Sequence, residues 1–184
     1  MPDILRGETM GPDKNFFKWI AQYPFDALIK GDLDACTEFL LSKQLFSPTS
    51  STIGCLGFCW GAWVVAKTLS TPPSEDHKWS NLLKCGVGLH PSTHVEASVF
   101  KQDEEKMILD IPLPLLLCTA GNDKANLKAG SPLVTHMESK GGKSVDYPDM
   151  VHGWVARGDF SKENVLRDAN DALGKTVDHF SQNL

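Results

Sequence analysis

The sequence lacks any apolar run near the roughly 20 residues that a membrane-spanning helix needs. Its opening stretch, MPDILRGETMGPDKN, contains no apolar segment of the kind that secretory signals carry. The last residues, Ser181-Gln182-Asn183-Leu184, have no cysteine nearby to accept a prenyl group. We therefore expect neither a membrane span, nor secretion, nor a lipid anchor, and we expect a cytoplasmic protein.

Basic charge is scarce as well. Lysine and arginine number 18 against 23 aspartates and glutamates, which gives a formal net charge of −5. A nucleic-acid surface needs a patch rich in lysine and arginine to replace the phosphate counterions, so we expect no nucleic-acid partner. The length of 184 residues suits one domain, and residues 1–184 are expected to form a single one.

The cysteines follow no disulfide or metal-site pattern, and neither a CxxC pair nor an HExxH motif is present. Their number is odd and their spacing irregular: Cys36, Cys55, Cys59, Cys85 and Cys118. Without a secretory signal, a disulfide framework is not expected, and a reducing environment is. Most of these thiols should be small buried hydrophobic groups, which leaves open whether one of them is reactive.

Four short apolar or β-branched runs predict strands. They cover Thr52–Phe58, Lys84–Leu89, Leu113–Thr119 and Lys143–Tyr147. The third run is almost entirely apolar, as expected of a parallel strand that is covered on both faces. Helical patterns lie between the runs, and strands that alternate with helices indicate a parallel α/β sheet with helices on both sides.

Two of the predicted helices have well-marked ends or faces. Ser131 is expected to cap a helix that begins at Pro132 and stops at Gly141. A last helix is predicted over about residues 162–180. Its buried face is expected to hold Val165, Ala169, Ala172, Val177 and Phe180.

The first predicted strand leads directly into Gly57-Phe58-Cys59-Trp60-Gly61 and then into a helix. A nucleophile elbow needs such a sharp turn, with the nucleophile in strained backbone geometry. Gly57 and Gly61 are small enough to let the strand and the helix approach closely. The start of a helix lowers the pKa of a thiol below its free value of about 8.5. Cys59 is therefore the candidate nucleophile, and the N–H of Trp60 is a candidate oxyanion donor.

Polar loops follow the third and fourth predicted strands. The first contains Asn122-Asp123, and the second contains Asp149 and His152. A thiol nucleophile needs a base, which His152 can supply, and the base needs a carboxylate such as Asp123 to orient it. The order Cys59, Asp123, His152 is the nucleophile, acid, base order of the α/β-hydrolase fold.

Each of these residues taken alone also has a structural explanation. A GxCxG sequence can be a tight strand-to-helix turn, an Asn-Asp pair commonly forms a turn or a helix cap, and a lone histidine often only packs. Their joint occurrence is harder to explain by chance, because each follows a predicted strand. Functional groups of parallel α/β sheets gather at these carboxyl ends of the strands.

These motifs resemble the dienelactone hydrolase family, the cysteine-nucleophile branch of the α/β-hydrolases, over nearly the whole chain. The matching stretches are Pro2-Asp3-Ile4-Leu5-Arg6-Gly7, Gly57-Phe58-Cys59-Trp60-Gly61, His90-Pro91-Ser92, Gly121-Asn122-Asp123 and His152-Gly153-Trp154-Val155-Ala156-Arg157. The resemblance implies an α/β-hydrolase-type three-layer sandwich with a mostly parallel sheet. It also implies hydrolysis of small esters or enol-lactones through an acyl-cysteine, with no cofactor and no metal.

The resemblance further implies that arginines hold a carboxylate of the substrate. Arg6 and Arg157 are the candidates, although a solvated surface position would explain either of them equally well. The small-molecule ester or lactone is the only partner that the resemblance implies, and the sequence indicates neither a particular substrate nor an oligomeric state.

The chain departs from the family at its start, because family members have several strands before the stretch that resembles residues 2–7. We therefore expect an N-terminally truncated form in which the Thr52–Phe58 strand has an exposed apolar edge. By resemblance, the missing part includes a central strand, a second oxyanion donor and an acidic residue near the thiol. Loss of one oxyanion donor lowers turnover by about 10²–10³.

Three functions follow from these observations. The first is a thiol hydrolase that uses Cys59, Asp123 and His152, and the second is a catalytically inactive remnant or binding module of the same fold. The third is a redox or metal protein, suggested by Cys55-x-x-x-Cys59 and His90-x-x-x-His94. The third is disfavoured, because Cys55 and Cys59 fall inside and beyond one strand and a loop is expected at residues 91–92.

Overall fold

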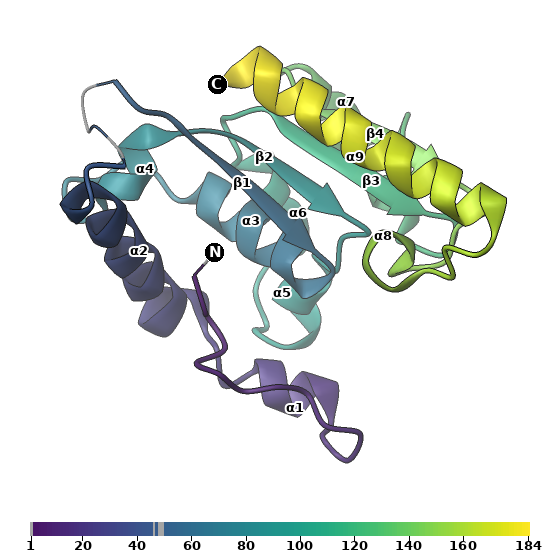
Figure 1. Cartoon of the computed structure of the whole chain (residues 1–184), viewed down its shortest axis with the longest axis horizontal. Helices are drawn as coiled ribbons and strands as arrows, with labels where there is room; N and C mark the ends of the chain where they lie inside the picture. Colours follow the sequence, from purple (N-terminus) through teal and green to yellow (C-terminus); the bar gives the residue numbers. More distant parts are fainter. Residues whose placement is uncertain (1, 46, 48–49) are drawn as a thin grey trace.

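Four parallel strands form one sheet in the computed structural model, which describes residues 2–45, 47 and 50–184 (Figure 1). They are β1 (Ile53–Phe58), β2 (Leu83–Leu89), β3 (Leu115–Ala120) and β4 (Lys143–Tyr147). Their order across the sheet is β1-β2-β3-β4, and every neighbouring pair is parallel. The four predicted strands are thus confirmed, with ends that shift by at most two residues.

Helices cover both faces of the sheet, which makes three layers. Side chains along β3 alternate between the faces: Leu115 and Leu117 belong to one hydrophobic core, and Leu116 and Cys118 to the other. The first core lies against α3 (Trp60–Ser70), and the second lies against α9 (Glu163–Asn183). Figure 1 shows α9 across one face of the sheet and α3 across the opposite one. The apolar composition of β3 therefore reflects burial on both sides.

Shorter helices complete the layers. They are α1 (Phe16–Ile20), the π-helix η1 (Phe25–Ile29), α2 (Lys30–Ser42), α4 (Lys78–Leu82), α5 (Val95–Ser98), α6 (Glu104–Leu109), the 3₁₀-helix η2 (Ala125–Leu127), α7 (Pro132–Glu138) and α8 (Trp154–Arg157). Within the described part of the chain, no helix has the length and apolar character needed to cross a membrane.

Helix α7 begins as predicted. The Ser131 side chain accepts a hydrogen bond from the Val134 N–H, and Pro132 occupies the first turn. Gly141 has the positive φ of 81° that favours glycine, but it lies two residues beyond the C-cap at Ser139.

The predicted buried face of α9 is correct except at Val177. Ala169 and Ala172 are buried, and Val165 and Phe180 pack against the same core. Val177 is 63% exposed, whereas the neighbouring Thr176 is buried. The face continues through residues 169, 172 and 176, and Val177 lies about 100° further around the helix.

Strand β1 lies at one edge of the sheet and pairs with β2 alone among the described strands. Two of its large apolar side chains are partly open to solvent, Leu56 at 42% and Phe58 at 37%. This confirms the expected exposed apolar edge, an arrangement that proteins commonly protect by pairing or covering the strand.

Candidate active site

Cys59 occupies the turn between β1 and α3. Its φ of 54° and ψ of −120° lie in a region that residues with a side chain rarely adopt, so the backbone is strained as a nucleophile elbow requires. A hydrogen bond to the neighbouring strand holds the turn, because the Cys59 N–H donates to the Leu89 carbonyl at the end of β2. The thiol is thereby held at the start of α3.

The two glycines of the elbow differ in whether a side chain would fit at their position. A Cβ at Gly57 would lie 2.1 Å from the carbonyl oxygen of Gly61, so only glycine lets β1 and α3 approach this closely. A Cβ at Gly61 would meet no atom of the described residues within 4 Å. The prediction that a small residue is needed for close approach is therefore confirmed at Gly57. It is wrong at Gly61, where the structure leaves room for a side chain.

Trp60 is the first residue of α3, directly after the thiol. The first N–H groups of a helix have no acceptor within it, so the Trp60 N–H has no acceptor inside α3. The indole of Trp60 is buried and stacks on that of Trp63, with ring centroids 5.9 Å apart and an interplanar angle of 21°. This packing holds the first turn of the helix in place.

The structure brings Cys59, His152 and Asp123 into one chain of contacts. Cys59 Sγ lies 2.8 Å from His152 Nε2, and His152 Nδ1 lies 2.6 Å from Asp123 Oδ1. The Asp123 side chain is 3% exposed and that of His152 is 25% exposed. A buried carboxylate that holds Nδ1–H leaves Nε2 to exchange a proton with the thiol.

The loops after β3 and β4 hold Asp123 and His152 by further contacts. The second carboxylate oxygen of Asp123 accepts from the Ala120 N–H at 2.7 Å. Asn122 Oδ1 accepts from the backbone N–H of His152, also at 2.7 Å. A Cβ at Gly121 would lie 2.1 Å from the Pro148 carbonyl oxygen, so glycine is needed where the two loops meet. The sequence reasoning included Asn122 in a motif and gave it no role.

The charges of the site favour a thiolate beside an imidazolium. Burial raises the pKa of the Cys59 thiol, but the hydrogen bond and charge of His152, together with nearby His90, lower it to about 6. The hydrogen bonds to Asp123 and to Cys59 raise the pKa of His152 to about 9, against the effect of burial. By contrast, burial raises the pKa of Cys55 and of Cys118 to about 12. All five cysteines are free, and Cys59 differs from these two thiols in the direction of its pKa shift.

A model of the dienelactone hydrolase family matches residues 1–184, the whole length of the sequence. The chain belongs to the dienelactone hydrolase family. No curated protein gives a match.

Solved structures show the same fold as this family member. An acylaminoacyl peptidase in complex with Z-Gly-Gly-Phe-chloromethyl ketone is similar, with a TM-score of 0.58 and 15% identity over 84% of this chain. An uncomplexed acylaminoacyl peptidase from Pyrococcus horikoshii gives a TM-score of 0.56, with 15% identity over 84% of this chain. In each case the match covers 27% of the other chain. At this identity the likeness shows the α/β-hydrolase fold alone.

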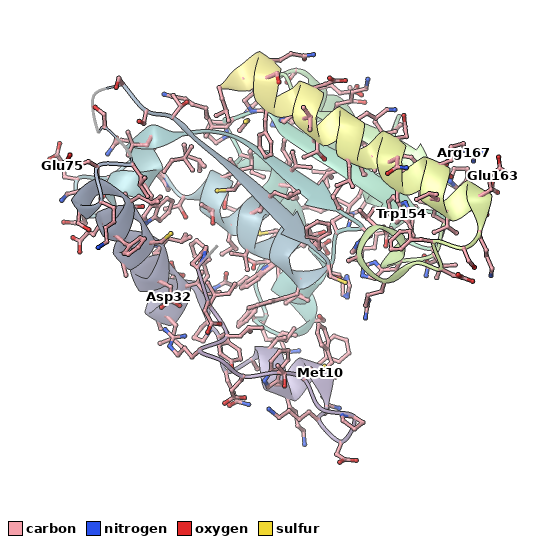
Figure 2. All side chains as sticks on the ribbon, in the orientation of Figure 1. Met10, Asp32, Glu75, Trp154, Glu163 and Arg167 are labelled. Atoms are coloured by element: carbon pink, nitrogen blue, oxygen red, sulfur yellow. The ribbon has the colours of Figure 1, made fainter. Side chains whose placement is uncertain are left out.

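The two arginines of this dienelactone hydrolase family member have different surroundings. The Arg157 Nη2 donates to Cys59 Sγ at 3.7 Å, so its exposed guanidinium lies at the thiol. Arg6 pairs with Asp32 of α2 at 2.8 Å, and no described contact joins it to Cys59 or His152. Figure 2 shows Asp32 well apart from Trp154, which follows the histidine loop. A substrate role stays a prediction for both arginines.

Two residues after β2 complete the surroundings of the thiol. Sequence reasoning placed both in a stretch that resembles the family and considered His90 only as a disfavoured metal ligand with His94. His90 is fully buried, and its ring centroid lies 5.1 Å from that of His152. Ser92 Oγ lies 3.4 Å from His152 Nε2, and the Ser92 N–H donates to the Cys59 carbonyl. The signal was available, because residues 90–92 directly follow a strand, as the other site loops do. The ligand atoms of Cys59, His90 and His152 lie within 4.8 Å of one another, close enough to bind one metal ion.

Proposed function

We propose that this chain hydrolyses small carboxylic esters or lactones through an acyl-enzyme on Cys59. The observation that carries the proposal is the continuous line from Cys59 Sγ to His152 Nε2 at 2.8 Å and from His152 Nδ1 to Asp123 Oδ1 at 2.6 Å. Membership of a hydrolase family and a positive φ at the thiol support the same conclusion.

In the acylation step, the Cys59 thiolate attacks the carbonyl carbon and forms a carbon–sulfur bond. The Trp60 N–H donates to the oxyanion that develops on the carbonyl oxygen. His152, as an imidazolium oriented by Asp123, gives its Nε2 proton to the leaving oxygen as the carbon–oxygen bond breaks. An alcohol leaves from an ester, whereas in a lactone the new hydroxyl stays attached to the acyl group.

In the deacylation step, neutral His152 takes a proton from a water molecule, and the water oxygen attacks the thioester carbon. The carbon–sulfur bond then breaks and returns the Cys59 thiolate, while the acid leaves. The imidazolium is restored, so the ion pair that begins the cycle also ends it. Asp123 fixes the imidazole and stays ionised throughout.

Arg157 is the candidate partner for a negatively charged substrate. Its guanidinium lies 3.7 Å from the Cys59 sulfur, within reach of a carboxylate on a small molecule bound at the thiol. Arginine forms two parallel hydrogen bonds with a carboxylate and so fixes its orientation. We propose the same role, with weaker support, for Arg6, whose guanidinium already binds Asp32.

The decisive test is p-nitrophenyl acetate hydrolysis by the folded, monodisperse chain beside its Cys59→Ala variant. We expect turnover in the native chain that falls to the uncatalysed rate in Cys59→Ala. Mass spectrometry after rapid acid quenching should show one acetyl group on the Cys59 peptide. Cys36→Ala removes another partly exposed thiol, located on α2, and should keep full turnover.

Two results would contradict the proposal. Equal turnover in the native chain and in Cys59→Ala would exclude the thiol as nucleophile. A folded native chain with no turnover, whose Cys59 is alkylated no faster than Cys36 at pH 7, would favour the inactive member or binding module of the same fold.

A further inference from the structure

His90 is a buried side chain whose hydrogen-bonding capacity is unused. It is 0% exposed, and among the described residues neither Nδ1 nor Nε2 has a partner at hydrogen-bond geometry. Buried polar groups nearly always find a partner, and one that has none calls for an explanation such as a bound ion. The backbone of His90 also has a φ of 40°, a conformation unfavourable for a residue with a side chain. The backbone at His90 is therefore strained.

The unused imidazole of His90 points into the cluster that contains the thiol. One nitrogen of His90, Cys59 Sγ and one nitrogen of His152 all lie within 4.8 Å of one another. In a tetrahedral zinc site, with Zn–S of about 2.3 Å and Zn–N of about 2.0 Å, ligand atoms are roughly 3.3–3.6 Å apart. To bind one ion, the three side chains must rotate until these atoms reach such separations.

We propose that Cys59, His90 and His152 bind one Zn²⁺ ion, which blocks the thiol reversibly. The ligand set is one thiolate and two imidazoles, with water in the fourth position. Thiolate and imidazole are the ligands that zinc prefers, whereas Mg²⁺ and Ca²⁺ prefer oxygen ligands. The site is therefore selective for zinc and similar soft cations.

The surroundings of His152 already match those of a zinc-bound histidine. Zinc-binding histidines almost always donate their second ring N–H to a carboxylate or a carbonyl group. His152 Nδ1 lies 2.6 Å from Asp123 Oδ1, which directs the lone pair of Nε2 toward the thiol. The Cys59 thiolate and the Asp123 carboxylate together carry two negative charges, which balance the charge of one Zn²⁺ ion.

Metal binding changes the bonds of the site in a defined way. The proton that Cys59 and His152 share leaves to solvent, and Nε2 and Sγ each give a lone pair to the metal. The exposed guanidinium of Arg157, 3.7 Å from the sulfur, must move away because a second cation repels it. Both the nucleophile and the base are then occupied, so zinc prevents acylation.

The test begins with spectroscopy on the whole native chain and requires no turnover. Co²⁺, a stand-in for zinc, should give the visible bands of a tetrahedral site and a near-ultraviolet sulfur-to-cobalt band, and Zn²⁺ should displace it. X-ray absorption of the zinc form should show one sulfur at about 2.3 Å and two imidazole nitrogens at about 2.0 Å. This measurement on the unmodified chain does not depend on whether any variant folds.

Variants assign the ligands. We expect Cys59→Ala to remove the sulfur-to-cobalt band, and His90→Gln to weaken Co²⁺ binding at least tenfold. The control is His77→Gln, which alters a histidine bound to Asp34 outside the cluster and should leave Co²⁺ affinity unchanged. Removal of the competing cation in Arg157→Gln should strengthen binding. A zinc site with a single imidazole, or an affinity that His90→Gln leaves unchanged, would overturn the proposal.

The inhibitory effect, unlike the metal site itself, rests on the proposed hydrolase function. Micromolar Zn²⁺ should stop p-nitrophenyl acetate turnover and slow the alkylation of Cys59 by iodoacetamide, a chelator should restore both, and Mg²⁺ should affect neither. A chain without turnover that still gives the cobalt spectrum would contradict the hydrolase and leave the metal site standing. Turnover that zinc does not lower, or that zinc raises, would contradict the inhibition and leave the hydrolase standing.

Discussion

The Asn122 side chain holds the backbone of His152: its Oδ1 accepts the His152 N–H at 2.7 Å, across the gap between the loops after β3 and β4. The neighbouring Asp123 binds the ring of the same histidine at Nδ1. Two consecutive residues of one loop thus fix both the main chain and the side chain of the candidate base. The position of the imidazole relative to the thiol depends on both contacts.

Asn122→Ala should lower turnover while the chain stays folded. Asn122 is exposed, so loss of its hydrogen bond costs only about 0.5–1.5 kcal/mol of unfolding free energy. A small displacement of a catalytic group, however, lowers the rate up to about 10²-fold. We expect kcat for p-nitrophenyl acetate to fall about tenfold with KM nearly constant. Asn81→Ala removes a similar exposed hydrogen bond, to Ser74, and should change neither constant; equal losses in both variants would contradict the positioning role.

The thiolate–imidazolium pair predicts a broad plateau of activity against pH. The hydrogen bond and charge of His152 outweigh burial and hold the pKa of Cys59 at about 6, and those of Asp123 and Cys59 raise the pKa of His152 to about 9. We expect kcat/KM to rise with an apparent pKa near 6 as the pair loses its first proton, and to fall near 9 as the imidazolium loses the second. A rising limb near 8.5 would indicate an ordinary thiol.

The upper limb of this profile should depend on Asp123. Asp123→Asn removes the largest cause of the raised His152 pKa, so the falling limb should move to lower pH. Asp34→Asn acts on a different Asp–His pair, with His77, and should leave the profile unchanged. An upper limb that stays near 9 in Asp123→Asn would show that another group titrates there.

The sequence predicted the three candidate residues whose chemical type suggests a function. It missed the neighbours of the thiol that only the folded chain brings there. Cys59, Asp123 and His152 follow three separate strands in the expected order, and parallel strands carry their carboxyl ends to one edge of a sheet. His90 and Ser92 follow β2 in the same way, but the stretch that contains them indicated no role beside the thiol. Their proximity to the thiol depends on the register of β1 and β2, which pairs Phe58 with Leu89 and which local patterns do not encode.

The limits of the fold prediction have a similar origin. The strands and the long helices have clear periodicity, so the sheet could be predicted. The choice between Thr176 and Val177 depends on how α9 is rotated against the sheet. Hydrophobicity favours valine, but the Thr176 hydroxyl donates to the Ala172 carbonyl one turn earlier, so a threonine can be buried there with its hydrogen bond made.

Gly57 and Gly61 should respond in opposite ways to the same substitution. Gly57→Ala places a Cβ 2.1 Å from a backbone oxygen, so we expect a loss of at least ~3 kcal/mol of unfolding free energy. Gly61→Ala meets no neighbour, and alanine lowers the entropy of the unfolded chain, so a gain of about 0.4–1 kcal/mol is expected. Urea denaturation of the two variants measures the difference. Equal destabilisation would mean that close approach of β1 and α3 does not depend on Gly57.

Helix α9 offers a matched test of which face packs on the sheet. Val177 is 63% exposed, so Val177→Lys should change the unfolding free energy by less than about 0.5 kcal/mol. Ala172 lies on the sheet-facing side of the same helix and is 0% exposed. Ala172→Leu adds three carbon atoms to this packed position, so we expect it to destabilise the chain by about 1–3 kcal/mol. The two introduced residues, lysine and leucine, are both good helix formers, so a loss of helix propensity does not explain a destabilisation by either. A large loss in Val177→Lys, with none in Ala172→Leu, would mean that the valine face packs on the sheet as the sequence pattern suggested.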